Sequence, residues 1–198
     1  MSASQHPEPE AQKLRAEFIE AMSRAVTGVT IVTTDGPAGR FGQTVSAMTS
    51  VSADPPTLLV CIKTTSVITS AIIQHGHFGV NILRADQRRV ADTFAGRETW
   101  AAAYDFGIAR WDTLESESPL LVGAIGRFDC RLSQSLEVGS HSILFGEVAV
   151  AESHAGTPLL YARRTYGEHV EIPRQVNDLP FDFGVRLVDE DQEKGRHE

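Results

Sequence analysis

Residues 29–47 read VTIVTTDGPAGRFGQTVSA, and this stretch decides the fold class. Every residue of the segment 29–34 is β-branched, which favours a strand. The segment 35–39 (DGPAG) combines residues that favour tight turns. Residues 40–47 then have the composition of a second strand. The stretch therefore predicts an antiparallel β-hairpin.

The second strand of this hairpin has two chemically different faces. A period of two separates an apolar face, with Phe41, Val45 and Ala47, from a face with Gly42, Thr44 and Ser46. Hydroxyl groups on one face can hydrogen-bond the polar edge of a planar ligand, and Gly42 would leave room beside them. Threonine and serine also occur on half-exposed strands that bind nothing, so the spacing alone leaves both interpretations open.

Outward from the hairpin, the pattern predicts about seven strands and three helices. Helices are expected over residues 13–26, 67–74 and 86–95, with Gly28 and Gly96 ending the first and the third. Further strands are expected over residues 57–62, 78–82, 122–132, 142–151 and 159–161. Strands and helices do not alternate regularly, so the order favours a closed antiparallel barrel.

The composition is typical of one globular domain in a reducing compartment. The chain has 198 residues, 41% of them hydrophobic, and no internal repeat. Cys61 and Cys130 are too few for a disulfide framework, so we expect buried free thiols and a cytoplasmic location. No signal peptide or membrane span is apparent. The formal charge of -8 argues against a nucleic-acid partner.

The domain boundaries follow from polarity. Residues 1–11 are polar and contain proline, which predicts a disordered N-terminal tail. Residues 12–170 form the predicted domain. Residues 171–198 are a C-terminal extension, and its charged end lacks any periodicity.

The first candidate binding site is the turn KTTS at residues 63–66, just before the predicted second helix. A helix N-terminus presents free N–H groups and a partial positive charge, which suit a phosphate. Lys63 adds a full charge, and Thr64, Thr65 and Ser66 add hydroxyl donors. Hydroxyls also cap helices that bind no ligand, so the spacing is compatible with either role.

Two further residues are candidates because loops near strand ends often carry binding residues: His141 and Tyr166. Exposure of His141 and rim packing of Tyr166 are the alternatives. The sequence contains no GxGxxG, Walker, HExxH or GxSxG motif. The pair His75 and His77 lacks a third ligand, so no metal site is expected.

Several stretches together resemble the flavin reductase family, which supplies reduced flavin to two-component monooxygenases. They are FIEAMSRAVTGVTIVTT (18–34), GQTVSAMTSVSADPP (42–56), LLVCIK (58–63), FGVNIL (78–83), GSHSILFGEV (139–148) and PLLYARRTYG (158–167). The resemblance covers most of residues 14–167. It implies an FMN-binding split β-barrel, mainly β with a few helices, antiparallel and Greek-key-like, in a homodimer with the flavin near the interface.

The resemblance also implies roles for individual residues. The flavin ring and ribityl chain are expected on Thr44, Val45, Ser46 and Ala47, and the phosphate near Ser52, Lys63 and Ser66. His141, as the catalytic residue, and Tyr166 are expected to approach the nicotinamide or the flavin ring. The remaining implied cofactor contacts are Thr27, Gln43, Ser50, Cys61, Ile62, Phe78 and Asn81.

The implied activity is hydride transfer from a reduced nicotinamide to a flavin that is then released to a flavin-dependent monooxygenase. We expect FAD or FMN, with FAD preferred, and NADH as the donor, with NADPH as the alternative. The alternatives are an FMN-holding oxidase of the pyridoxamine phosphate oxidase type and a non-enzymatic flavin carrier or sensor. The chain departs from the family pattern at residues 139–141, where it has Gly-Ser-His and relatives often carry Gly-Asp-His. An acid that could fix the tautomer of the imidazole is therefore missing.

Overall fold

The structure, a computed structural model, describes residues 9–97 and 104–171. Residues 1–8 and 172–198, which hold most of both predicted terminal segments, lie outside these ranges. The described chain is mainly antiparallel β with three α-helices, as the sequence predicts. The helices are α1 (Pro9–Ser23), α2 (Val67–His75) and α3 (Arg88–Phe94), and two 3-10 turns are η1 (Ala85–Gln87) and η2 (Phe106–Ile108).

Twelve strands within the described residues form three sheets. They are β1 (Thr27–Gly28), β2 (Thr30–Thr34), β3 (Phe41–Val45), β4 (Met48–Ala53), β5 (Pro56–Lys63), β6 (His77–Ile82), β7 (Trp111–Asp112), β8 (Leu120–Leu121), β9 (Gly126–Val138), β10 (His141–Ser153), β11 (Leu159–Ala162) and β12 (Thr165–Glu168). The largest sheet has the order β3-β2-β6-β9-β10-β5-β4, and smaller sheets pair β1-β11-β12 and β7-β8.

The seven-stranded sheet is not closed by a hydrogen-bonded ladder among the described residues. Its two end strands, β3 and β4, are consecutive in the chain and are separated only by Ser46 and Ala47. The predicted second strand of the hairpin therefore ends at Val45, and the chain passes from one end of the sheet to the other. The closed barrel expected from the sequence is not found, because β3 pairs with β2 and β4 pairs with β5.

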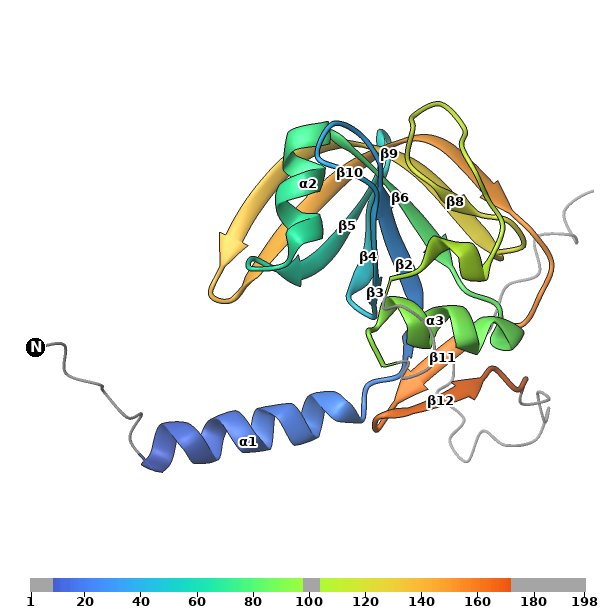
Figure 1. Cartoon of the computed structure of the whole chain (residues 1–198). Coiled ribbons are helices and arrows are strands. Elements are labelled where there is room, and N and C mark those ends of the chain that lie inside the picture. Colours follow the sequence, from blue (N-terminus) through green and yellow to red (C-terminus); the bar gives the residue numbers. More distant parts are fainter. Residues whose placement is uncertain (1–8, 98–103, 172–198) are drawn as a thin grey trace, which may run out of the picture.

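Strand β2 lies between two hydrophobic cores and is buried at all five positions. Val32 belongs to the core that contains α2, together with Ile72 and Phe78. Ile31 belongs to the core that contains α3, together with Phe94. Figure 1 shows α3 beside β11 and β12, away from α2. Side chains that alternate across β2 thus fill cores on both faces, which explains its unbroken run of β-branched residues.

A buried asparagine fixes the position of β2 relative to its neighbours. Asn81 on β6 is fully buried, and its amide nitrogen donates to the carbonyl of Ile31 at 3.1 Å. Its side-chain oxygen accepts from the backbone N–H of Leu121 at 2.6 Å. A buried amide without partners would cost about 1–3 kcal/mol, so this arrangement favours a single register.

Helix α1 differs from its predicted bounds and from its predicted environment. It begins at Pro9, whose fixed φ suits a first helical turn, and residues 9–11 belong to it rather than to a tail. It ends at Ser23, and Gly28 pairs with Leu160 in β1 instead of ending the helix. None of the α1 residues is buried, and Phe18 is 63% exposed. Figure 1 shows α1 projecting from the rest of the molecule.

Other elements follow the prediction with local differences. Helix α2 begins and ends within one residue of the expected bounds, and Gly76 ends it in the left-handed conformation with φ of 76°. Strand β4 was not predicted, because its sequence MTSVSA is polar and all but its first residue is exposed. Strand β12, in residues 165–168, was also missed. None of the described helices is long and apolar enough to span a membrane.

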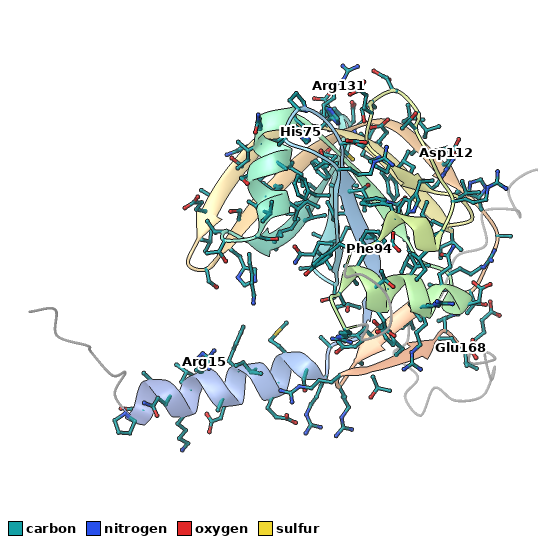
Figure 2. The ribbon with its side chains drawn as sticks, viewed as in Figure 1. Arg15, His75, Phe94, Asp112, Arg131 and Glu168 are labelled. Carbon is teal, nitrogen blue, oxygen red and sulfur yellow. The ribbon has the colours of Figure 1, made fainter. Side chains whose placement is uncertain are left out.

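His75 joins the C-terminus of α2 to the turn between β2 and β3. Its Nε2 accepts from the backbone N–H of Ala38 at 3.0 Å. The Thr34 hydroxyl donates to the carbonyl of His77, so it accepts from Nδ1 of His75 at 2.9 Å. These contacts require the neutral imidazole with the proton on Nδ1. Figure 2 shows His75 at the end of α2 that faces this turn.

The neutral state of His75 makes stability depend on pH. Burial and His77 lower the pKa of His75 from its ordinary 6.5, although Asp35 and Glu117 act in the opposite direction. The unfolded chain therefore takes up a proton at higher pH than the folded chain does. The stabilising contribution is complete above about pH 6.5 and is lost as the pH falls below it.

We therefore expect the melting temperature of the protein to fall more steeply than that of the His75→Gln variant between about pH 7.5 and pH 5.5. Glutamine keeps one acceptor and one donor but does not titrate. His169→Gln, at an exposed histidine, is the control and should follow the unsubstituted protein. Parallel curves for the His75 variant and the unsubstituted protein would contradict the assigned tautomer.

Candidate functional site

The candidate site is built around the free edge of β3. This strand pairs with β2 on one side only, so alternate backbone groups on its other edge have no strand partner among the described residues. Two hollows flank it. We call them the Ser66 pocket and the Tyr166 pocket, and each takes residues from the segment 43–46 that the sequence singled out.

The Ser66 pocket has a volume of about 370 Å³ and lies between β3 and the N-terminus of α2. Ser66 is the N-cap residue of α2, but its side chain makes no capping hydrogen bond. The hydroxyl instead donates to Oε1 of Gln43 at 2.5 Å. The backbone N–H groups of Val67 and Ile68 therefore have no side-chain cap, and both residues line this hollow, whereas the N–H of Thr69 donates to the carbonyl of Ser66 at 3.0 Å. Its lining residues are Arg40, Phe41, Gly42, Gln43, Ser66, Val67, Ile68 and Tyr104.

The end of β5 lies just before this helix in the chain and pairs with the start of β10. Lys63 is exposed at the end of β5, and its register partner on β10 is His141. The backbone N–H of Thr64 donates to the carbonyl of Ser140 at 3.1 Å, which holds the two strand ends together. The structure thus brings the predicted phosphate residues Lys63 and Ser66 to the same end of the sheet as His141.

His141 is exposed, and its imidazole has one close polar neighbour. The hydroxyl of Ser140 lies 2.9 Å from Nδ1. A hydroxyl can donate or accept, so Ser140 orients the ring without selecting one tautomer as a carboxylate would. The other nitrogen, Nε2, has no hydrogen-bond partner among the described residues.

The Tyr166 pocket, of about 100 Å³, lies at the other end of β3. It brings Thr44, Val45 and Ser46 together with Tyr166, as the resemblance implied that they would be near one another. The remaining lining residues are Val29, Ala95, Arg97 and Tyr161. The two tyrosine rings come from paired positions on β11 and β12, and their centroids are 5.3 Å apart.

Tyr166 is held as a wall of this pocket. Its hydroxyl donates to Oδ1 of Asp92 on α3 at 2.9 Å, and the Arg88 guanidinium lies 5.3 Å from its ring centroid. Burial, followed by the hydrogen bond to Asp92, raises the pKa of Tyr166 to about 12. The phenol therefore keeps its proton at neutral pH, and Tyr166 can shape and position a ligand but cannot act as a base.

Two of the predicted cofactor contacts have fully covered side chains. Phe78 and Asn81 are both fully buried on β6. Phe78 packs in the core under Gly146, where an added Cβ would meet its ring at 2.5 Å. The Asn81 amide is occupied by Ile31 and Leu121. Neither side chain is available to a ligand, because both faces of β6 are covered. The alternation of residues along the strand did not reveal this covering.

Gly42 lines the Ser66 pocket, and it also allows close packing against α3. A Cβ at this position would lie 2.6 Å from the ring of Phe94, so the glycine allows the ring to approach the strand. Figure 2 shows Phe94 between α3 and the sheet. Thr44 on the same face donates its hydroxyl to the carbonyl of Ala91 in α3 at 2.8 Å. The predicted hydroxyl face is therefore partly covered by α3.

The remaining predicted contacts lie apart from the two pockets. The hydroxyl of Thr27 in β1 donates to the carbonyl of Tyr161 in β11 at 3.4 Å. Ile62 is buried in the core, so only its backbone could reach a ligand. Cys61 is partly exposed, and burial raises the pKa of its thiol. The carbonyl of Ala47 accepts from the Cys61 N–H at 3.0 Å.

Ser50 and Ser52 are exposed on β4. The Ser52 hydroxyl hydrogen-bonds the backbone N–H and carbonyl of Asp54 in the turn that follows the strand.

Sequence reasoning missed three residues of the Tyr166 pocket and its wall: Asp92, Arg97 and Tyr161. Arg97 follows Gly96 in a segment without periodicity, so no motif pointed to it. Tyr161 could have been found, because the short predicted strand at 159–161 ends on an aromatic residue. Asp92 becomes relevant only through its tertiary contact with Tyr166.

The fold and the site define a class: a mainly β protein with a free strand edge, an open helix N-terminus and two adjoining pockets, as expected of a protein that binds nucleotide cofactors. The family model described as "Flavin reductase like domain" matches residues 22–169. The chain therefore belongs to this family.

Individual relatives agree with this assignment. The protein "FMN reductase (NADH) RutF" of Ancylobacter novellus is 42% identical over 153 residues, which are 77% of this chain and 83% of the relative. BorF, the flavin reductase component of a bacterial two-component tryptophan halogenase, is 32% identical with a TM-score of 0.70, over 82% of this chain and 99% of that one.

A third relative has a structure with ligand fragments. The NADH:FAD oxidoreductase SgcE6 of Streptomyces globisporus, solved in complex with NAD and FAD fragments, is 28% identical with a TM-score of 0.71. The match covers 89% of this chain and 99% of that one.

Proposed function

We propose that this protein is an NADH-dependent flavin reductase, which transfers a hydride from the nicotinamide to a flavin and releases the reduced flavin to a monooxygenase. The observation that carries the proposal is the placement of two pockets along one strand edge. The Ser66 pocket contains a helix N-terminus, and the Tyr166 pocket contains an arginine and two tyrosines. Two nucleotide ligands could thus meet over β3.

The residues present fit a flavin with a terminal phosphate. The Ser66 side chain does not cap α2, which leaves the first N–H groups of the helix for an anion, and Lys63 adds a charge nearby. The unpaired edge of β3 offers backbone donors and acceptors to the polar edge of the ring, and Gln43 adds a side-chain amide. His141 stands at the same end and is assigned to orienting the nicotinamide.

Hydride transfer between nicotinamide C4 and flavin N5 is chemistry that the two ligands supply. The role of the protein would be to hold the two rings within reacting distance, about 3–3.5 Å, and to exclude water from between them. Tyr166 keeps its proton and acts as a fixed wall. No described side chain of the two pockets has to exchange a proton for the transfer itself.

We favour FMN over FAD as the acceptor, which reverses the expectation from the sequence. The relative from Ancylobacter novellus is named an FMN reductase, and so is one from Stutzerimonas stutzeri, while the Streptomyces neighbour is named for FAD. Their names specify NADH. The flavin is expected to bind reversibly, because a reductase of this kind has to release its reduced product.

The direct test is NADH oxidation by the purified, ligand-stripped protein with FMN, FAD or riboflavin added in turn. We expect turnover that saturates with the added flavin and is most efficient with FMN. Gel filtration of the mixture should separate the flavin from the protein. Flavin binding without NADH oxidation would reject the reductase and leave a carrier, and tight FMN retention with oxidase activity would indicate the pyridoxamine phosphate oxidase type.

A second prediction tests the position of the flavin phosphate. Lys63→Gln removes a charge-assisted contact, so FMN affinity should fall by about 1.5–3 kcal/mol, roughly ten- to hundredfold in Kd. Riboflavin lacks the phosphate and is the matched ligand control, whose Kd should stay within about twofold. Fluorescence titration measures both. Equal losses for FMN and riboflavin would place the phosphate elsewhere.

The split barrel and the homodimer are part of this proposal. Strands β3 and β4 at the two ends of the sheet are joined through Ser46 and Ala47, which supports closure of the sheet at this corner. For the dimer, the support is α1, where Leu14, Phe18 and Met22 recur at intervals of four and are 67%, 63% and 55% exposed. An unpartnered apolar stripe of this kind favours burial in an interface.

We propose that a second copy of the chain covers the stripe on α1, because exposed apolar residues also occur on the sheet. Leu136 and Val51 are both 49% exposed on β9 and β4. Ile143 lies between Leu136 and Cys61 in the sheet register, so Leu136, Ile143 and Cys61 share one face of the sheet. The two apolar surfaces of each chain can then be buried against a second copy.

Light scattering after size exclusion tests the interface. Phe18→Glu should convert the dimer to monomer, because a carboxylate cannot be buried unpaired in an apolar contact. Ala16→Glu introduces the same charge on the other side of α1 and should remain dimeric. A monomeric unsubstituted protein, or a dimeric Phe18 variant, would contradict the proposed role of α1.

A further inference from the structure

Arg97 lies in the Tyr166 pocket and contacts an aromatic residue of β11. Its guanidinium lies 5.3 Å from the ring centroid of Tyr161 and donates to the Tyr161 hydroxyl at 3.0 Å. It contributes to the Tyr166 pocket beside Thr44 and Ser46. The contacts hold a cation against the strand that we assign to the flavin.

No carboxylate of the described residues forms an ion pair with Arg97. Other arginines around the sheet have such partners: Arg40 pairs with Asp35, Arg84 with Asp86, Arg88 with Asp92, Arg127 with Asp112 and Glu152, and Arg131 with Glu115. Arg97 is also exposed. Only one of its five N–H donors is used in a hydrogen bond within the described residues, so most of its donors are available to an anion.

The wall around Arg97 is rigid. Tyr161 and Tyr166 are paired across β11 and β12, and Tyr166 is anchored to Asp92 on α3. Arg88 lies over the ring of Tyr166 and pairs with Asp92 at 3.6 Å. A guanidinium held by a hydrogen bond to an aromatic residue that is itself fixed loses little freedom when it binds a ligand, which favours bidentate recognition of a phosphate.

We propose that Arg97 is a specificity-determining residue that binds the pyrophosphate of the nicotinamide dinucleotide, with Tyr161 as its positioning residue. The proposal rests on the proposed reductase function. Strand β3 lies between two candidate phosphate sites, the N-terminus of α2 at the Ser66 pocket and Arg97 in the Tyr166 pocket. Two ligands that stack their rings over one strand edge need separate phosphate sites, and these two groups supply them.

The test compares hydride donors with and without phosphates. For Arg97→Gln, KM for NADH should rise about ten- to hundredfold, with kcat changed less than about threefold, because the lost contact is made equally in the ground and transition states. N-benzyl dihydronicotinamide, which has the reacting ring but no phosphate, should be oxidised as by the unsubstituted protein. Arg97→Lys keeps the charge without the planar fork and should have an intermediate KM.

Two further variants separate positioning and general charge effects. Tyr161→Phe removes the hydroxyl that holds Arg97 and should raise KM for NADH several-fold, again with little change in kcat or in the rate with the phosphate-free donor. Arg131→Gln is the matched charge control. The Arg131 side chain pairs with Glu115 near the end of the molecule opposite α1 (Figure 2). The KM of the Arg131→Gln variant for NADH should therefore not change.

Three outcomes for the Arg97→Gln variant would overturn the proposal. The first two are an equal loss of activity with both hydride donors and an unchanged KM for NADH. The third is a raised Kd for FMN with the Kd for riboflavin unchanged, which would mean that Arg97 binds the flavin phosphate. Binding of NAD⁺, measured by calorimetry on the full chain, keeps the test independent of turnover. If the unsubstituted protein does not oxidise NADH, the proposed function fails. A weaker NAD⁺ affinity of the Arg97→Gln variant would still support the phosphate site.

Discussion

The burial of β2 on both faces is the constraint on which the rest of the structure depends. Because Val32 fills one core and Ile31 the other, a slip of one residue in its pairing would exchange the two sets of side chains. The Asn81 amide adds a directional requirement, since its donor and acceptor are satisfied only when β6 and the Leu121 segment take their observed places. The register of β3, which pairs with β2, is fixed by the same arrangement.

The position of β3 explains why a binding site can exist there at all. One edge is held by β2, and Gly42 lets Phe94 press against one face. The other edge carries no strand, so its backbone groups remain for a ligand. A rigid strand with one free edge combines a fixed geometry with accessible hydrogen-bonding groups, and neither a central strand nor a loop offers both.

The sequence predicts local features well where a single physical requirement controls them. The hydroxyl-rich turn before α2, the hairpin around DGPAG and the long β9–β10 pair all follow from propensity and period. The burial of Phe78 and Asn81 could not be predicted, because a strand pattern does not tell which faces other elements cover. Arg97 and Asp92 could not be found, because their roles depend on contacts with β11 and β12, more than sixty residues away along the chain. The resemblance placed residues such as Ser66 and Tyr166 in a site, while the structure divides them between two pockets.

This division has a consequence for affinity. A hollow of about 370 Å³ is at the small end of ligand pockets, and the free edge of β3 adds contacts on one side only. In the proposed arrangement, one chain would enclose a flavin incompletely, which would limit the binding energy and allow the product to leave. A reductase that passes its product to another enzyme gains nothing from tighter uniform binding, because this would stabilise substrate and transition state equally and slow release. The open strand edge, the shallow pockets and the uncovered apolar surface of α1 are thus consistent with a site that a second chain completes and a ligand leaves.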